Sequence, residues 1–210
     1  ATSSAASDVY KRQEIENSSF IGLHPVPIVY GMTIGEYGKM INGEGWLENK
    51  TKANLEVIRI KNYNHNLKYE PPVRPSPNLP NLQSIYLYPS LAFLEKTEVS
   101  VGRGTKIQFQ IYGHPNFISD FSFTPMPNFG SQYPKLNGKL SFGEDLRNYK
   151  TKDKIELKWL IKSYNQISDK TKFFRSDFDK LSGISNLKKQ IIEGVSESLI
   201  RESWKDGLEK

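Results

Sequence analysis

The residues best suited to binding a polar ligand lie in a short glycine-rich segment, where Arg103 stands between Gly102 and Gly104 and Thr105 follows. Glycine adopts backbone conformations that other residues avoid, so the chain can turn sharply while one guanidinium is held at the turn. A guanidinium can bind a carboxylate through two parallel hydrogen bonds. We therefore expect Arg103, Gly104 and Thr105 to contact a polar or anionic ligand. For Arg103 the alternative is a structural role, in which it braces an interface between domains.

A proline-rich segment upstream offers a second group of polar side chains. Pro75, Pro77 and Pro80 fix their own φ angles and keep the residues before them out of the α-helical region. Ser76 and Asn78 are therefore expected on a stiff, extended backbone. The Asn78 amide can donate hydrogen bonds to, and accept them from, hydroxyl or acetamido groups of a ligand. The alternative is a turn in which the Asn78 side chain bonds to nearby backbone.

One acidic and one aromatic residue lie between these two segments. Glu95 follows the apolar run L-A-F-L and is the best acidic candidate for catalysis in this part of the chain. The alternative for Glu95 is a structural salt bridge. Tyr88 carries a ring that can stack on a sugar, although aromatic side chains more often pack in a core.

The composition argues against several other kinds of site. The chain contains no cysteine and only three scattered histidines, so we expect no disulfide, no thiolate chemistry and no histidine-based metal site. The segment G-R-G-T lacks the G-x-x-x-x-G-K-[ST] spacing of a phosphate-binding loop, and we expect no cofactor. The net charge of +6 is spread along the chain without a basic block, which argues against nucleic acid as a partner. No apolar run approaches the roughly 18 residues of a membrane span.

The N-terminal part of the chain is predicted to end an α/β unit. Thr33 and Glu36 have the spacing of a capping box, and the apolar residues that follow predict a helix over 34–41. The apolar run L-E-V-I-R-I at 55–60 predicts a strand. Loop, helix and strand in this order are typical of the last part of a doubly wound sheet. Tyr30 lies just before the helix, where it can reach a ligand in the cleft beyond the strand ends.

After a polar link over 63–74, the remaining residues are predicted to form an α+β domain. A helical stripe begins at Leu82 and is predicted to stop at Pro89. Apolar residues then alternate with glutamines over 107–111, which predicts a half-buried strand. Further short strands joined by proline and glycine turns are expected after Pro115.

The C-terminal part is predicted to be helical. The pattern from Asp153 predicts a helix over 153–164 with Asp153 as its N-cap. Two further helices are predicted over 184–192 and 196–210, with Gly194 interrupting the pattern between them. The polar link is the predicted domain boundary, which gives a first unit at 14–66 and a second unit at 67–210.

Six segments match one known family in sequence and spacing. They are P-I-V-Y-G-M-T-I-G-E at 27–36, N-G-E-G-W-L at 42–47, P-S-P-N-L-P-N at 75–81, L-Y-P at 87–89, L-E-K-T at 94–97 and S-V-G-R-G-T at 100–105. In this order they resemble the exo-β-N-acetylmuramidases, the NamZ/YbbC-like proteins, and the resemblance covers nearly all of the chain after residue 13. One departure is Lys96, which stands where the family usually has glycine and argues against a close backbone approach there.

The resemblance implies a fold and a function. The fold would be the tail end of a Rossmann-like, doubly wound domain followed by a smaller α+β domain. The activity would be the release of terminal N-acetylmuramic acid from the non-reducing end of peptidoglycan fragments, with Arg103 binding the lactyl carboxylate of that sugar. The family's proposed catalytic glutamate lies in the Rossmann-like half and would precede Glu14. The alternative from the residues is a non-catalytic glycan-binding module. The expected sugar contacts are Tyr30, Ser76, Asn78, Tyr88, Arg103, Gly104 and Thr105.

The ends of the chain carry a separate expectation. Ser3–Gln13 matches the in-frame translation of a common sequencing adapter, so we expect residues 1–13 not to be native protein. We accordingly expect the chain to be a fragment truncated at both ends. The resemblance implies a bacterial parent protein that is periplasmic or secreted, and the sequence indicates no oligomeric state.

Overall fold

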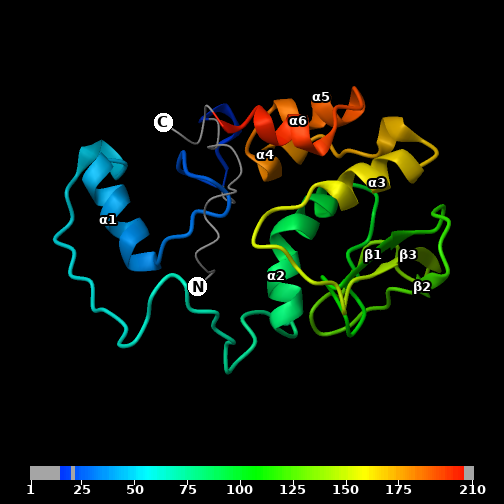
Figure 1. Cartoon of the computed structure of the whole chain (residues 1–210), viewed down its shortest axis with the longest axis horizontal. Helices are drawn as coiled ribbons and strands as arrows, with labels where there is room; N and C mark the ends of the chain where they lie inside the picture. The colour runs from blue at the N-terminus through cyan, green and yellow to red at the C-terminus, as the bar shows by residue number, and fades with distance from the viewer. Residues whose placement is uncertain (1–14, 20–21, 206–210) are drawn as a thin grey trace.

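The computed structural model describes residues 15–19 and 22–205, so the expectation about residues 1–13 lies outside the described residues. Helix α1 lies at one end of the molecule, and the other elements form a larger body that two long loop segments connect to it (Figure 1). In the described ranges the helices are α1 (Ile34–Glu44), α2 (Leu82–Leu91), α3 (Lys158–Gln166), α4 (Phe178–Ser182), α5 (Asn186–Ile192) and α6 (Glu197–Glu202), and the strands are β1 (Ile111–His114), β2 (Phe121–Phe123) and β3 (Ser141–Asp145).

The strands of the described chain form one antiparallel sheet in the order β1-β3-β2. Gly113 of β1 pairs with Gly143 of β3, which lies in turn opposite Phe121 of β2. A Cβ atom at Gly143 would collide with the carbonyl oxygen of Tyr112, so β1 approaches β3 more closely here than a side chain permits. The prediction of short strands joined by proline and glycine turns after Pro115 is confirmed.

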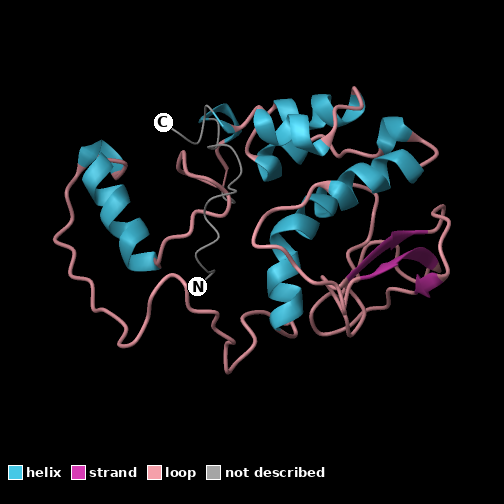
Figure 2. Ribbon diagram, in the orientation of Figure 1, coloured by secondary structure: helices cyan, strands magenta, loops and turns pink. Residues whose placement is uncertain are grey.

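The hydrophobic core lies in the larger body and joins helices that are distant in the sequence. Figure 2 shows the helices α3 to α6 gathered at one end of this body and the strands at the other. Helix α2 packs against α3, and α4 packs against α5 and against the short 3₁₀ helix Ala92–Lys96 that follows α2. The large side chains that are almost completely buried come from these helices and from the segments between and after them, and include Leu91, Leu94, Phe109, Leu160, Phe173, Phe178 and Trp204.

Helix α2 continues past the residue that was expected to stop it. The prediction that Pro89 ends the helix is wrong, since α2 runs to Leu91 and the 3₁₀ helix carries the turn on to Lys96. Proline removes one backbone donor, but Leu91 and Leu94 are fully buried and their burial favours continuing the turn. The helix begins with a capping box between Asn81 and Ser84.

The predicted strand over 107–111 is also wrong, because β1 begins only at Ile111. Phe109 has a φ angle of +55° and donates its N–H to the carbonyl of Val101 at 2.8 Å, which closes a turn. The alternating glutamines are buried rather than exposed to water. Gln108 donates to the carbonyl of Pro77 at 2.7 Å, and Gln110 accepts from the side chain of Asn81 at 2.9 Å.

The strand predicted over 55–60 does not form. In the described ranges no strand pairs with this segment, and Ile58 and Ile60 are 89% and 77% exposed. A lone extended segment gains neither ladder hydrogen bonds nor burial, so it has no regular structure. The described residues therefore form a mixed fold of helices with a three-stranded antiparallel sheet, and the Rossmann-like part of the expectation stays a prediction.

The C-terminal helices are present but shorter than predicted. Helix α3 begins at Lys158, not at Asp153, and the N–H of Leu157 donates to the carboxylate of Glu197 on α6 at 2.9 Å. The predicted third helix begins after Ser196, as expected, but α6 ends at Glu202. The short helix α4 is capped at its C-terminal end by Gly183, which has a φ angle of +70°.

Candidate functional site

A cavity of about 1000 Å³ lies between the N-terminal segment and the C-terminal end of α2. Its walls come from residues 22–37 and 60–69 on one side and from Tyr88–Phe93 on the other, with a contribution from α4. The lining is mainly aliphatic and aromatic, with several tyrosine hydroxyls. Tyr30 and Tyr88, both predicted to bind ligand, line this cavity.

One side of the cavity is lined by His24, Tyr30 and Tyr37, whose rings belong to two stacked aromatic pairs. Tyr30 stacks on Tyr37 with 4.9 Å between ring centroids, and His24 stacks on Trp46 at 5.2 Å. The ring nitrogen Nδ1 of His24 lies 2.8 Å from the hydroxyl of Tyr37, which joins the two pairs. Burial raises the pKa of the Tyr37 hydroxyl above its usual value, so Tyr37 is uncharged at neutral pH. Sequence analysis missed His24, and it placed Tyr37 only in a helical pattern.

The opposite wall connects to a charged pair. The Tyr88 ring lies 4.9 Å from the Phe109 ring, and the Arg103 guanidinium carbon lies 5.0 Å from the same ring. Arg103 donates to both carboxylate oxygens of Glu95, from Nε at 2.5 Å and from Nη2 at 2.8 Å. Tyr88, Glu95 and Arg103 are thus brought together around Phe109. Glu95 and Arg103 do not belong to the cavity lining, and Tyr88 links them to it.

The charge balance of this cluster depends on Glu95 and Arg103 together. Burial, and then the negative charge of Glu95, raises the pKa of Tyr88, while Arg103 opposes that shift. The hydrogen bonds to Glu95 raise the pKa of Arg103, which keeps the guanidinium charged. Both side chains are about 30% exposed, so water and a ligand can reach the pair.

Asn78 and Ser76 lie in a separate cluster of loops. Asn78 is 9% exposed, and its amide donates to the carbonyl of Gly130 at 2.7 Å. Its backbone N–H donates to the hydroxyl of Ser76 at 3.2 Å. These contacts hold the proline-rich segment against the loop between β2 and β3. Neither side chain lines the cavity.

Gly104 and Thr105 are held by the same loop. The Thr105 hydroxyl donates to the carbonyl of Gly102 at 2.7 Å, which closes the turn around Arg103. A Cβ atom at Gly104 would lie 2.6 Å from the carbonyl oxygen of Met126, so only glycine fits there. Their geometry positions Arg103, and neither residue lines the cavity.

Lys96, the residue that departs from the family pattern, is tied to helix α4. Its ammonium pairs with the carboxylate of Asp177, and its carbonyl accepts from the N–H of Arg175 at 3.0 Å. Thr97 and Phe174 form an isolated β-bridge beside this pair. The turn that carries Glu95 is therefore fixed from the C-terminal helices as well as from Arg103.

Across residues 15–19 and 22–205, no group of three histidine, aspartate or glutamate side chains is arranged to hold a metal ion. No helix in these ranges is long and apolar enough to cross a membrane.

The predicted capping box is present at the edge of the cavity and gives the first testable prediction. The N–H and hydroxyl of Thr33 donate to Glu36 at 2.7 and 2.9 Å, and His65 contacts the other carboxylate oxygen at 3.0 Å. These contacts, the Thr33 backbone bond first, lower the pKa of Glu36 from 4.5 to about 2. Because the folded pKa is depressed, the stabilisation of α1 is complete above pH 4.5 and lost as pH falls through about 2.

This prediction is checked by amide hydrogen exchange in the first turn of α1. Exchange, corrected for its intrinsic pH dependence, is expected to accelerate between pH 4.5 and 2 in the wild type. Glu36→Gln keeps an oxygen that can accept from Thr33 but has no charge to lose, so its exchange is expected to show no change in that interval. An identical pH response in Glu36→Gln would show that another group controls the helix end.

Comparisons with known proteins cover both parts of the chain. Residues 11–83 match the family model described as exo-beta-N-acetylmuramidase NamZ, N-terminal, and residues 86–210 match its C-terminal counterpart. A Bacillus subtilis (strain 168) protein described as peptidoglycan beta-N-acetylmuramidase NamZ is 31% identical over an alignment 221 residues long, and the alignment covers 94% of this chain and 52% of the relative. The chain thus spans about half the length of that curated relative.

Two solved structures of DUF1343 family proteins from Bacteroides fragilis NCTC 9343 are similar to the chain. The first is 39% identical, with a TM-score of 0.92, and the match covers 98% of this chain and 60% of the other. The second is 18% identical, with a TM-score of 0.72, and covers 96% of this chain and 59% of the other, so it supports the fold alone. The described fold is therefore that of these proteins over the aligned part.

Proposed function

Because the chain belongs to the exo-β-N-acetylmuramidase NamZ family, we propose that it is part of a glycoside hydrolase that acts on peptidoglycan. The observation that carries the proposal is the match to both family models, together with the 31% identity to a peptidoglycan β-N-acetylmuramidase. The whole protein would release terminal N-acetylmuramic acid from the non-reducing end of peptidoglycan fragments, in the periplasm or outside the cell. The chain would supply one wall of the interdomain cleft.

The cavity supports sugar binding through its aromatic walls. Ligand pockets are mostly apolar and aromatic, with a few polar groups that fix orientation. Tyr30 and Tyr88 belong to opposite sides of this cavity and offer ring faces together with hydroxyl groups. A pyranose ring has apolar C–H faces and polar edges, so it matches such a pair of tyrosines.

The charged pair supports a role for Arg103 in recognising the lactyl carboxylate of N-acetylmuramic acid. Glu95 uses the Nε and Nη2 donors of Arg103. A guanidinium has five N–H donors in a fixed fork, so it can bind a second carboxylate while it remains paired. Glu95 would then hold Arg103 in the orientation that the sugar requires.

Glu95 is better suited to stabilising charge than to donating a proton. Glycoside hydrolysis normally uses one carboxylic acid to protonate the leaving oxygen and one carboxylate at the anomeric carbon. Both oxygens of Glu95 accept hydrogen bonds from Arg103, so neither oxygen is free to hold a proton toward a leaving group. We propose that the main catalytic glutamate lies in the Rossmann-like half of the family's fold, at a position that precedes Glu14.

A non-catalytic glycan-binding module is the second candidate. The observation that favours it is that Glu95, the acidic residue among the predicted contacts, is already paired with Arg103. A binding module needs aromatic and polar contacts but no acid and base. The hydrolase proposal expects the glycosidic bond to be cleaved once the chain is joined to the rest of the family's fold. The binding-module proposal expects only binding of the sugar.

The test is the release of free N-acetylmuramic acid from a MurNAc–GlcNAc disaccharide, measured by chromatography. The 210-residue chain alone is expected to release none. The chain joined to the part of the Bacillus relative that it does not cover is expected to release the sugar. Release by the chain alone would disprove the assignment of the catalytic glutamate. A folded joined protein that binds the disaccharide without cleaving it would favour the binding module.

A further inference from the structure

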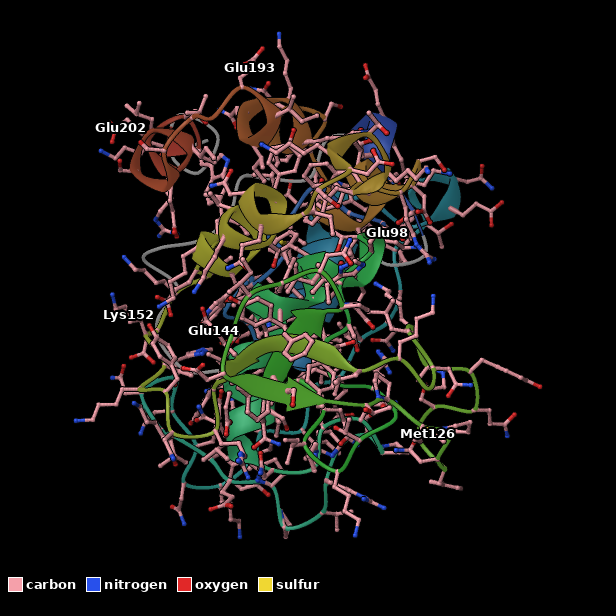
Figure 3. The ribbon with its side chains drawn as sticks, turned by 90° about the vertical axis from the view of Figure 1, so that its right-hand side faces the viewer. Glu98, Met126, Glu144, Lys152, Glu193 and Glu202 are labelled. Atoms are coloured by element: carbon pink, nitrogen blue, oxygen red, sulfur yellow. The ribbon has the colours of Figure 1, made fainter. Side chains whose placement is uncertain are left out.

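A lysine outside the predicted site contacts the turn that carries Glu95. Lys135 lies in the loop between β2 and β3, and Met126 of the same loop is labelled beside the strands in Figure 3. Its Nζ atom lies within hydrogen-bond distance of four backbone carbonyl oxygens: those of Leu94 at 3.0 Å, Glu95 at 3.2 Å, Thr97 at 2.6 Å and Val99 at 2.8 Å.

The four carbonyls form a site for a cation. They lie at and just after the C-terminal end of a helical run, where unpaired carbonyls give a negative potential. An ammonium group offers three N–H donors, so the four oxygens share them. An uncharged side chain of the same length would remove the ammonium donors from these oxygens, which is costly for partly buried groups.

The charged side chains around Lys135 shift its pKa in opposite directions. Burial and then the positive charge of Arg175 lower the pKa of Lys135 to about 7, and Arg103 acts in the same sense. Glu95 and Glu98 oppose this shift. Below neutral pH the side chain is therefore mainly an ammonium ion.

The same turn sets the position of the Glu95 carboxylate. Two of the four oxygens belong to Leu94 and to Glu95 itself, so Lys135 holds the backbone on both sides of the Glu95 Cα atom. The Thr97 hydroxyl donates to the Leu94 carbonyl at 2.8 Å and accepts from the N–H of Val99 at 3.1 Å. These bonds make the turn stiff, so a change at the cation site is transmitted to the pair with Arg103.

We propose that Lys135 is a positioning residue: it supplies a built-in cation to the four-carbonyl site of residues 94–99 and thereby orients the Glu95–Arg103 pair. Lys135 touches no predicted ligand contact through its side chain and acts through the backbone of Glu95. The consequence for glycan recognition rests on the proposed function. The effect on the ion pair does not, because it can be measured without any ligand.

The test observes the Arg103 Nε–H signal by ¹⁵N NMR in the full chain, at a pH of about 6, where the ammonium form dominates. In Lys135→Ala, hydrogen exchange at this position is expected to accelerate about tenfold, as for the loss of one charge-assisted hydrogen bond. n-Propylammonium has the three carbons and the nitrogen that alanine lacks, so adding it is expected to restore slow exchange. n-Propanol, which has a similar shape without charge, is expected to restore nothing.

Two further variants separate positioning from a general loss of stability. Lys135→Met fills the space without charge and is expected to show the same fast exchange. Lys139→Ala, an exposed lysine on the same loop, is the matched control and is expected to leave Arg103 unchanged. Slow exchange in a folded Lys135→Met protein, or fast exchange that propylammonium does not reverse, would overturn the proposal. If Lys135→Ala does not fold, refolding that requires propylammonium supports the proposal, and failure to refold with it contradicts the proposal.

Discussion

Arg103→Ala is expected to lower the rate of N-acetylmuramic acid release by the joined protein by about 100-fold, the usual cost of removing one preorganised charged donor. The variant removes both hydrogen bonds to Glu95 and leaves that carboxylate partly buried without its cation. It also removes the group proposed to bind the lactyl carboxylate. Kinetic analysis on MurNAc–GlcNAc, with thermal denaturation as a folding check, measures the effect.

The matched control is Arg147→Ala, which removes a two-pronged pair with Asp145 on the protein surface. It is expected to leave the rate unchanged, because exposed ion pairs contribute little. A second substrate, GlcNAc–GlcNAc, lacks the lactyl group, so Arg103→Ala is expected to affect its cleavage much less. Equal losses on both substrates would assign Arg103 to bracing Glu95 instead of binding the sugar. If Arg103→Ala lowers the rate on neither substrate, the sugar is recognised by other residues.

Gly143→Ala is expected to destabilise the protein by about 3 kcal/mol or more, at the upper end of the cost of overpacking. The new methyl group would collide with the carbonyl oxygen of Tyr112, a backbone atom that cannot rotate away. The strands β1 and β3 must then move apart, which weakens their pairing around Gly113. Denaturant unfolding, followed by circular dichroism, measures the change in free energy.

Gly43→Ala is the control for this substitution. Gly43 lies in helix α1, has no neighbouring atom within 4 Å of its Cβ position and has no positive φ angle. Alanine there is expected to favour the helix by about 0.5–1 kcal/mol. Similar destabilisation by the two substitutions would contradict the close approach of β1 and β3.

The sequence predicted correctly those structural elements that depend on contacts between residues close together in the chain. The Thr33–Glu36 capping box is present because its partners lie three residues apart. Gly194 has a φ angle of +74° and separates α5 from α6, as the interruption in the helical pattern predicted. The helical pattern over 153–164 likewise contains Trp159 and Leu160, which are both buried in the core.

Other features depend on contacts between distant parts of the chain, which no short pattern contains. Pro89 would end an isolated helix, but burial of Leu91 extends α2. The run 55–60 has strand composition but pairs with no strand in the described ranges. For the candidate site, the sequence named Tyr30, Tyr88, Glu95 and Arg103, which the structure places at the cavity or beside it.

Lys135 had no sequence signal at all. Its acceptors lie 36 to 41 residues away along the chain, and all of them are backbone atoms. Ser76, Asn78, Gly104 and Thr105 were predicted as contacts from residue type alone. Residue type cannot tell a ligand contact from a loop contact, because the same hydrogen-bonding groups serve both purposes.

The use of main-chain acceptors at the Lys135 site has an evolutionary consequence. Every residue has a carbonyl oxygen, so the side chains at positions 94, 95, 97 and 99 can be exchanged without removing an acceptor. The donor has no such freedom, because few side chains can carry three N–H groups on a long flexible stem. With respect to the cation site, tolerance to substitution should therefore be one-sided: a substitution in the turn leaves its four carbonyl acceptors in place, whereas replacement of Lys135 removes the donor.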